Sequence, residues 1–505
     1  MTHIDFVDQT LRDGQQSLWG MKMRAYEAAD ALPHLDRTGF KVIDLTGAGM
    51  FTVLLRSFAD DPWATTDFLV KNLPNNTIRS GLRTISVIGF AHTPEVIIDL
   101  WVKTMIKHRV TSFWLYDCLF DLPTMHRLVE VVRKEGGIPV PAIMYGLTGV
   151  HDDAFFARQA AEMATWEGVE SIYLEDAAGV LKPERAATLL PAIRAATGTI
   201  PLELHCHNTT GLAQLNYIEG LKAGFEILHT CSRPMANGPS LPSTEGMLPI
   251  LAELGFTHSL DVDAMPPVAE NFVRMAAEGG YETGVQAEYD PRIYHHQLPG
   301  GMTGTLKAQL TQHKMMDRLP EVLEAIPQVR EELGQPIMAT PFSQFVGIQA
   351  VLNVVTGDRY AMVPDEVIHY TLGHYGPLPK DVDPAVKDRI LSSPRAAEIA
   401  RWVRPDPTLA EIRSKFAAGI SDEELLLRFM CSDEEVDAMQ AKGPIRTDPR
   451  RSANHIVREL ADLIAEKRQV TSLAVTTPGF SLSLGRNCAT GLRRGRRPKA
   501  PLAVT

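Results

Sequence analysis

Cysteine is scarce in this chain, and several targeting features are missing. Only five cysteines occur among 505 residues, and they are scattered, so they do not predict a disulfide framework. No uninterrupted apolar run approaches the roughly 20 residues that a membrane-spanning helix needs. The N-terminus lacks the basic region of a signal peptide. We therefore expect a cytoplasmic protein in a reducing compartment, without a membrane span.

An excess of positive charge is also absent. The formal net charge is −11 and the pI is about 5.8, which argues against nucleic acid as the main partner because phosphate binding needs clustered cations. Apolar residues make up 45% of the chain, and the mean hydropathy is −0.07. A chain of this length and composition can form two or three globular domains with large cores.

The first 260 residues alternate β-rich runs with amphipathic helical stretches. Strands are expected at residues 3–8, 41–46, 79–83, 112–117, 139–145, 171–175, 201–205 and 226–230. Helices are expected at 24–38, 94–107, 121–135, 152–167, 183–196 and 211–223. Eight strands alternating with helices over about 250 residues predict a (β/α)8 TIM barrel over residues 1–260. The alternative is a doubly wound open sheet.

Polar or reactive side chains lie at the end of nearly every expected strand, which favours the barrel. They are Asp8, Thr46, Arg83, Asp117, Tyr145, Glu175, His205 and Cys231. In a barrel these residues converge on one mouth, whereas an open sheet would spread them along an edge. The sequence therefore predicts a functional site at the carboxyl ends of the strands.

The remainder of the chain changes in character twice. Residues 261–470 are dominated by helical patterns, such as 302–316 and 319–333, and predict a mainly α-helical second domain. Residues 471–505 are rich in Ser, Thr and Gly, and they gather cations at 493–499. Such a segment cannot bury enough apolar surface to order itself, so we expect a disordered basic tail.

The segment His205-Cys206-His207 predicts a metal site at the end of the seventh strand. Residues two apart on a strand point the same way, so both imidazoles can face one point while Cys206 faces the other side. Asp8, at the end of the first strand, is the expected carboxylate ligand. This donor set suits a divalent metal such as Zn, Co or Mn. The alternative is a pair of histidines hydrogen-bonded at a strand end.

Several segments together resemble the carboxyltransferase family of biotin-dependent enzymes. That family comprises the carboxyltransferase domain of pyruvate carboxylase, the α subunit of oxaloacetate decarboxylase and the 5S subunit of transcarboxylase. Within the barrel the resemblance lies in DQTLRDGQQSLWGMKMR (8–24), GAGMFTVLLRSFADDPW (47–63), LEDAAGVLKP (174–183) and LHCHNTTGLA (204–213). Beyond the barrel it lies in HHQLPGGM (295–302), ATPFSQFVGIQAVLNVVTGDRY (339–360) and GHYGPLP (373–379). The second group is the more specific, because other metal-dependent enzymes with this barrel lack it.

The resemblance implies carboxyl transfer between carboxybiotin and a small 2-oxo acid through a metal-stabilised enolate. It implies Asp8, His205 and His207 as metal ligands. Gln16, Arg56 and Arg83 match positions that bind the acceptor, and Arg12 and Gln16 are expected to act in catalysis. Arginine suits an acceptor carboxylate because its guanidinium forms two parallel hydrogen bonds.

Three positions depart from the family pattern. Glu175 stands where the family has a carboxylated lysine bound to the metal, and we expect Glu175 to serve as ligand and catalytic residue because it already carries a carboxylate. Pro239 falls where pyruvate carboxylases have a proton-shuttling threonine, and proline has no hydroxyl. Ser240 or Thr244 could replace that hydroxyl. Phe120 replaces an asparagine.

The tripeptide Met21-Lys22-Met23 is similar to a biotinylation motif but lies in the wrong context. A biotinyl lysine needs the exposed hairpin tip of a small β domain, whereas Lys22 lies between the first barrel strand and the start of the first expected helix. We therefore expect biotin on a separate carrier protein. The expected partners are a biotin carboxyl carrier protein and a biotin carboxylase subunit, in a complex in which this chain forms a homodimer.

Two other functions remain open at this stage. The sequence segments around Arg12 and His205 also resemble those of 2-isopropylmalate synthases and related lyases. This resemblance indicates a biotin-independent lyase or acyl-CoA condensing synthase. Glu175, Pro239 and Phe120 leave room for a catalytically inactive scaffold. Loops at the mouth of such a barrel vary freely, so the sequence does not name the acceptor.

Overall fold

A computed structural model describes residues 2–300, 306, 310, 311, 315–448, 472–477 and 480–485. The chain divides into two compact units, residues 1–447 and residues 448–505. Within the described residues, no helix is both long and apolar enough to cross a membrane.

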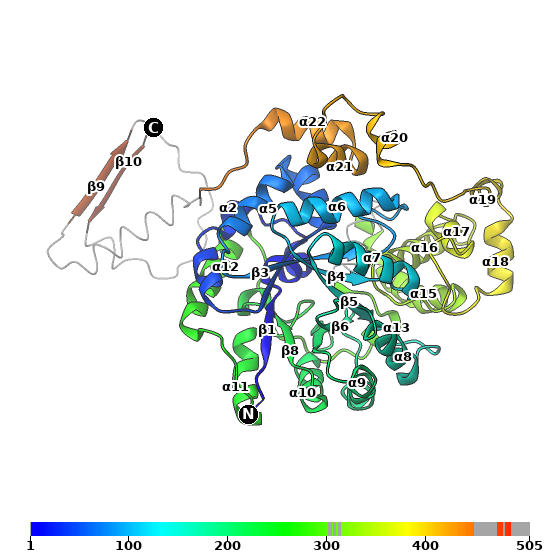
Figure 1. The fold of residues 1–505 in the computed structure, drawn as a ribbon, viewed down its shortest axis with the longest axis horizontal. Helices are drawn as coiled ribbons and strands as arrows, with labels where there is room; N and C mark the ends of the chain where they lie inside the picture. Colours follow the sequence, from blue (N-terminus) through cyan, green and yellow to red (C-terminus); the bar gives the residue numbers. More distant parts are fainter. Residues whose placement is uncertain are drawn as a thin grey trace. The chain divides into compact units, whose positions relative to one another are not determined.

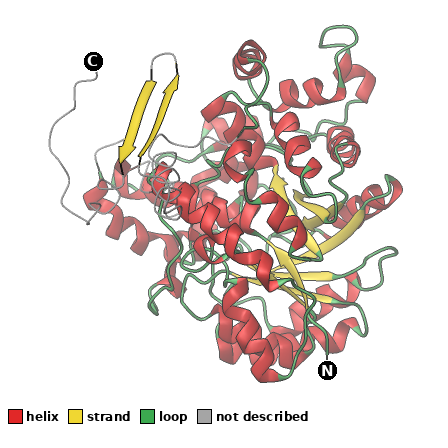
Figure 2. Ribbon diagram, turned by 90° about the vertical axis from the view of Figure 1, so that its left-hand side faces the viewer, coloured by secondary structure: helices red, strands yellow, loops and turns green. Residues whose placement is uncertain are grey.

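The first unit contains a closed barrel of parallel strands, each hydrogen-bonded to the next along the chain, with β8 pairing back to β1. The strands are β1 (Asp5–Asp8), β2 (Val42–Gly47), β3 (Thr77–Arg83), β4 (Ser112–Tyr116), β5 (Ile138–Met144), β6 (Ile172–Asp176), β7 (Leu202–Cys206) and β8 (Ile227–Thr230). Helices surround these strands in Figures 1 and 2. The predicted TIM barrel is confirmed.

Four of the barrel helices begin at strong N-cap residues: α5 (Pro62–Lys71), α7 (Leu122–Lys134), α8 (Asp153–Met163) and α11 (Thr244–Leu254). Asp61, Asp121, Asp152 and Ser243 each accept a hydrogen bond from a backbone N–H of the first turn, which satisfies donors that have no partner inside the helix. The other helices on the barrel are α6 (Glu95–Lys107), α9 (Pro183–Thr197) and α10 (Ala213–Ala223).

Short helices occupy the connections after β1 and β2. The helix expected at 24–38 is divided into α2 (Ala25–Ala28) and α3 (Leu32–Arg37). Pro33 lies in the first turn of α3, where its missing N–H costs nothing, and this favours a new helix start there. The other short elements are η1 (Thr10–Gly14), α1 (Gln15–Trp19), α4 (Ala48–Val53) and η2 (Leu54–Phe58).

The region after the barrel is mainly helical, as predicted. Its helices are α12 (Met265–Gly279), α13 (Ile293–His296), α15 (Leu319–Glu332), α16 (Phe342–Thr356), α17 (Asp365–Thr371), α18 (Pro384–Leu391), α19 (Pro394–Ile399), α20 (Leu409–Arg413), α21 (Asp422–Met430) and α22 (Asp433–Lys442). Single turns of 3-10 helix lie at η3 (Arg233–Met235), η4 (Val262–Ala264) and η5 (Met316–Arg318). Most of the helical pattern expected at 302–316 lies outside the described residues.

The helical region and the barrel belong to one compact unit rather than separating at residue 260. The Trp19 indole donates to the Glu282 carbonyl at 2.9 Å, and the Gln297 amide donates to the Leu147 carbonyl at 2.7 Å. Farther along, α21 and α22 pack on the barrel through the pairs Lys107–Glu423 and Asp60–Lys442. Hydrogen bonds and ion pairs therefore join the two parts at several places.

The second unit contains two antiparallel strands, β9 (Ser472–Thr477) and β10 (Phe480–Gly485). They fall inside the range 471–505, for which the composition predicted disorder, so the structure differs from that expectation here. Pro478-Gly479, a typical turn dipeptide, lies between the two runs in the sequence. The basic residues 493–499 lie outside the described part of the chain.

Candidate metal centre

Asp13, His205 and His207 converge at the carboxyl ends of β1 and β7. Asp13 Oδ2 lies 3.4 Å from Nε2 of His205 and 3.4 Å from Nε2 of His207. One ligand atom from each of the three residues lies within 4.8 Å of the others, and all three side chains are buried. One carboxylate and two imidazoles form a donor set typical of divalent transition metals.

The alternation of β7 brings the two histidines together. His205 and His207 flank Cys206, whose side chain is fully buried and whose backbone N–H donates to the Tyr217 hydroxyl at 3.4 Å. Asp13 comes from the tight π-helical turn η1 that follows β1. Its neighbour Gly14 leaves little room there, because a Cβ would lie 3.0 Å from the Met235 carbonyl oxygen.

Asp8, the carboxylate expected from the sequence, is not part of this group. It is fully buried and accepts hydrogen bonds from the Thr10 N–H at 3.1 Å and the Thr10 hydroxyl at 2.7 Å. Burial raises the pKa of Asp8 to about 7, although the bonds from Thr10 oppose the shift. Asp8 therefore shapes the start of the loop, while Asp13, five residues later, brings its carboxylate to the histidines.

Charges within the group favour a bound cation. Burial raises the pKa of Asp13, but Arg12 and His207 outweigh it and hold that pKa well below its ordinary value. Burial lowers the pKa of His207, but Asp13 outweighs it and raises the pKa to about 9. Burial holds the pKa of His205 well below its ordinary value. Near neutral pH the metal-free site thus pairs a carboxylate with a proton on His207, and a metal ion can replace that proton.

Each histidine directs Nε2 toward Asp13. His207 Nδ1 lies 2.6 Å from the Pro239 carbonyl oxygen, so it carries a proton and donates. His205 Nδ1 lies 3.3 Å from His229 Nδ1, and His205 Nε2 is buried without a hydrogen-bond partner in the described structure. A buried nitrogen without a partner, aimed at a carboxylate, fits a metal ligand.

Glu175 lies beside the group as a further carboxylate. It is on β6, paired in register with His205 of β7, and its Oε2 is buried without a partner in the described structure. Burial raises the pKa of Glu175 to about 7. The charge of Asp13 adds to this shift, whereas the charges of Arg12 and His207 oppose it. The Glu175 oxygens lie outside the three-residue group, so its role as a ligand stays a prediction.

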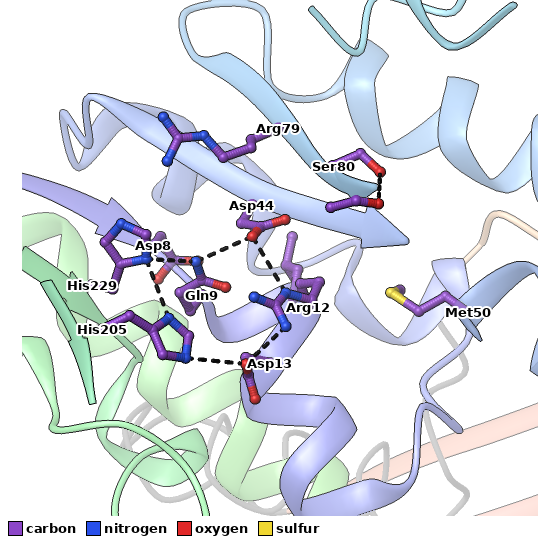
Figure 3. Close-up of polar contacts among 12 residues, drawn as sticks. Asp8, Gln9, Arg12, Asp13, Asp44, Met50, Arg79, Ser80, His205 and His229 are labelled. Carbon is purple, nitrogen blue, oxygen red and sulfur yellow. Dashed lines mark hydrogen bonds and ion pairs between the residues drawn. The ribbon is translucent and has the colours of Figure 1, made fainter. Parts of the chain in front are cut away.

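Arg12 has one nitrogen available for a substrate. Its Nη1 donates to Asp13 at 2.8 Å, and its Nε donates to Asp44 at 3.3 Å. The guanidinium lies 5.1 Å from the centre of the Trp114 ring, and the buried Nη2 has no partner among the described residues. Figure 3 shows Arg12 held between the two aspartates. The arrangement leaves a fixed cation with a free donor beside the candidate metal ligands.

The other expected acceptor contacts do not join this group. Gln16 is exposed on α1. Arg56, on η2, is more than half exposed and pairs with Glu435 of α22 at 2.6 Å. Arg83 ends β3, donates to the Gly89 carbonyl at 2.9 Å, and lines a narrow cavity. The structure thus brings only Arg12, of the four polar side chains expected to act on the acceptor, into direct contact with Asp13.

Phe120, which departs from the family pattern, and the two candidate replacement hydroxyls of Ser240 and Thr244 have partners away from the ligand group. Phe120 packs against Phe155 with ring centres 5.1 Å apart. The Ser240 hydroxyl donates to the Met235 carbonyl at 2.7 Å, and the Thr244 hydroxyl lies 2.7 Å from that of Thr230. The partners of both hydroxyls therefore lie outside the three-residue group.

Sequence reasoning missed several buried polar residues inside the barrel. They are Gln9, Asp13, Asp44, Arg79, Glu203 and His229. A usable signal was present, because a charged or amide side chain inside an apolar strand needs a buried partner. Asp13 also stands in the same motif as Asp8, directly after Arg12.

Comparisons with known proteins agree with this fold and identify the family. The family described as "Conserved carboxylase domain" matches residues 293–477, and the one described as "HMGL-like" matches residues 124–270. A pyruvate carboxylase subunit of Methanocaldococcus jannaschii is 31% identical over 391 residues, which is 77% of this chain and 68% of that protein. The 2-oxoglutarate carboxylase large subunit of Hydrogenobacter thermophilus is 29% identical over 457 residues, or 88% of this chain and 70% of that protein.

A transcarboxylase subunit and a solved structure extend the likeness. The methylmalonyl-CoA carboxyltransferase 5S subunit of Propionibacterium freudenreichii subsp. shermanii is 29% identical over 76% of this chain and 75% of its own. The carboxyl transferase domain of Rhizobium etli pyruvate carboxylase has the same fold, with a TM-score of 0.77 at 23% identity over 88% of this chain and 78% of that one. The chain belongs to the carboxyltransferase family of biotin-dependent carboxylases and transcarboxylases.

Proposed function

We propose that this chain is the carboxyltransferase subunit of a biotin-dependent carboxylase, decarboxylase or transcarboxylase. It moves a carboxyl group between carboxybiotin, held on a separate carrier protein, and a small 2-oxo acid. The observation that carries the proposal is the convergence of Asp13, His205 and His207 at the mouth of the barrel. Family membership, and the match over 293–477 in particular, favours carboxyl transfer over the lyase or synthase alternative.

In this proposal a divalent cation, such as Zn²⁺, Co²⁺ or Mn²⁺, is held by Asp13, His205 and His207, with Glu175 as a further carboxylate. When bound, such a cation supplies the positive charge that stabilises an enolate. Glu175 is poised for this because its free Oε2 is buried and has no other partner in the described structure.

Arg12 binds the carboxylate of the acceptor through its free Nη2. Asp13 and Asp44 accept hydrogen bonds from the other guanidinium nitrogens, and the Trp114 ring packs against the guanidinium. The Arg12 side chain is therefore already ordered before the acceptor binds. Gln16, Arg56 and Arg83 belong to the same proposal as outer contacts to the acceptor or to the incoming carboxybiotin. Arg56 must first release Glu435.

The proposal includes partner proteins. A biotin carboxyl carrier protein and a biotin carboxylase subunit complete the reaction, and the chain acts as a homodimer in the cytoplasm. The described cysteines, Cys118, Cys206, Cys231 and Cys431, are all free thiols, which suits a reducing compartment. Light scattering of the purified chain checks the dimer.

The test is isotope exchange that depends on biotin. The full chain, loaded with Zn²⁺ or Co²⁺, is mixed with a biotinylated carrier protein and a labelled 2-oxo acid, beginning with pyruvate and 2-oxoglutarate. We expect label to exchange between one of these acids and its carboxylated product. The matched controls are the unbiotinylated carrier and the variant Asp13→Asn. Exchange that persists without biotin, or no exchange across a panel of 2-oxo acids, would contradict the proposal.

A further inference from the structure

His229 connects the candidate ligand His205 to an ion pair buried inside the barrel. On one side, His229 Nδ1 lies 3.3 Å from His205 Nδ1. On the other, His229 Nε2 lies 2.7 Å from Glu203 Oε2. The Tyr173 ring stacks on the imidazole at 4.6 Å, and His229 is fully inaccessible to solvent. The ring is therefore held at both nitrogens and on one face.

Glu203 is fixed as a carboxylate by Arg79. The two side chains form two parallel hydrogen bonds, of 2.5 Å and 3.1 Å, and the Ser171 hydroxyl donates a third bond to Glu203 at 2.5 Å. Because β3 and β7 are four places apart in the ring of strands, this pair spans the barrel interior. A carboxylate only accepts hydrogen bonds, so His229 must carry a proton on Nε2.

Gln9 determines the state of the other nitrogen of His229. The Gln9 amide nitrogen donates to Asp44 Oδ2 at 3.1 Å, which identifies this atom as the amide NH2 group. The same nitrogen lies 3.0 Å from His229 Nδ1. A dashed line marks this contact between Gln9 and His229 in Figure 3. A second amide hydrogen thus faces Nδ1 of His229, which must be an acceptor.

The state of His229 determines the tautomer of His205. Two unprotonated ring nitrogens 3.3 Å apart would repel each other, so His205 carries its proton on Nδ1 and shares the acceptor nitrogen of His229 with the Gln9 amide. Nε2 of His205 is then unprotonated and directed at Asp13, where it is buried without a hydrogen-bond partner in the described structure. Histidine ligands generally have such a partner on the nitrogen that does not bind the metal.

We propose that His229, oriented by Glu203 and Arg79, is a positioning residue that holds His205 in the tautomer able to bind the metal. The inference rests on the proposed metal centre and deepens it. No substrate contact is assigned to His229, Glu203 or Arg79. They act through His205 alone.

The test compares metal affinity among variants of the full chain. His229→Leu removes the acceptor for His205, whereas His229→Asn retains a side-chain oxygen that can accept. We expect His229→Leu to weaken the binding of Co²⁺ by about 10- to 100-fold, with His229→Asn closer to the wild type. The measurement is competition with a chromophoric chelator, together with the visible spectrum of bound Co²⁺, which reports the ligand set independently of activity. Circular dichroism of each metal-free variant confirms that it is folded.

Ser171→Ala is the matched control, since Ser171 contacts Glu203 in the same buried network but not His229. It should leave Co²⁺ affinity within about twofold of the wild type, while Glu203→Gln should weaken it by about 10-fold or more. A folded His229→Leu protein that binds Co²⁺ as tightly as the wild type overturns the inference and leaves the metal centre intact. Equal losses in His229→Leu, His229→Asn and Ser171→Ala overturn it as well, because they indicate general disruption. A wild-type chain that binds no divalent metal overturns the metal centre itself, and this inference with it.

Discussion

His207 donates a hydrogen bond from Nδ1 to the carbonyl oxygen of Pro239, across 2.6 Å. Proline lacks a hydroxyl and an N–H, but it keeps its backbone carbonyl, and here that carbonyl orients a candidate metal ligand. The contact uses only the main chain of Pro239, so it does not depend on a side-chain hydroxyl at this position. The bond leaves Nε2 of His207 facing Asp13.

Metal binding should strengthen as the pH rises. Burial lowers the pKa of His207, but Asp13 outweighs it and raises the pKa to about 9, so the metal must displace a proton below that pH. Glu175, with a pKa raised by burial to about 7, adds a second proton at lower pH. We expect affinity to rise about tenfold per pH unit from about pH 7 to pH 9, and more steeply below. Titration calorimetry in two buffers measures the protons released. A constant affinity over this range would contradict the assignment.

Asp13 and Asp8 should respond differently to the same substitution. Asp13→Asn removes a ligand, and we expect a loss of metal affinity greater than the roughly 10- to 100-fold that follows loss of an orienting residue. Asp8→Asn keeps the bond from the Thr10 N–H and loses only the bond from its hydroxyl. It should bind metal normally and lower the free energy of unfolding by about 1 kcal/mol. Equilibrium dialysis and chemical denaturation distinguish the two variants, and the reverse pattern would restore Asp8 as the ligand.

Metal loading should not require bicarbonate. Where a lysine must first be carboxylated, CO2 controls assembly of the site, whereas Glu175 has its carboxylate from the start. We expect Zn²⁺ affinity to be the same in degassed and bicarbonate-containing buffer, and to fall in Glu175→Gln, which matches the shape of glutamate but has no charge. An increase on adding bicarbonate, or an unchanged affinity in Glu175→Gln, would show that this carboxylate is not a ligand.

The Arg79–Glu203 pair should matter for stability mainly when it is broken. Arg79→Met leaves a buried carboxylate without its cation, and we expect a loss of about 3–5 kcal/mol in the free energy of unfolding. Adding Glu203→Leu removes the stranded charge and should recover part of that loss. Urea denaturation of the metal-free variants measures both values. A double variant less stable than Arg79→Met alone would mean that Glu203 is stabilised mainly by His229 and Ser171.

Arg56 can bind an acceptor only by exchanging its partner. Its ion pair with Glu435 is exposed, and such pairs contribute at most about 1 kcal/mol. Glu435→Gln should therefore lower the KM for the acceptor, by no more than about fivefold, and Arg56→Ala should raise it. Metal affinity should change in neither variant. If KM is unchanged in both, the acceptor carboxylate is bound by Arg12 without help from Arg56.

Much of the architecture followed from local patterns along the chain. Alternating β-rich and helical runs predicted the barrel because apolar residues recur with a different spacing in a strand than in a helix. This spacing is a local property of each run and does not depend on distant residues. The two-residue spacing of His205 and His207 placed both imidazoles on one side of β7 for the same reason. The helix at 24–38 was expected to be continuous, but it breaks between Ala28 and Leu32, just before Pro33, a local signal that was available in the sequence.

The sequence by itself determined the barrel, the helical region after it, the paired histidines and the family. Only the tertiary structure decided which carboxylate joins those histidines. Asp8 ends a strand, as the pattern requires, but the π-helical turn after it directs Asp13 into the site, and the geometry of such a turn depends on contacts with Met235 and Ser232, more than 200 residues away. The sequence signals that Arg79, Glu203 and His229 need buried partners, but it does not say that they pair with one another. These residues lie on three strands, and they meet only because the barrel closes.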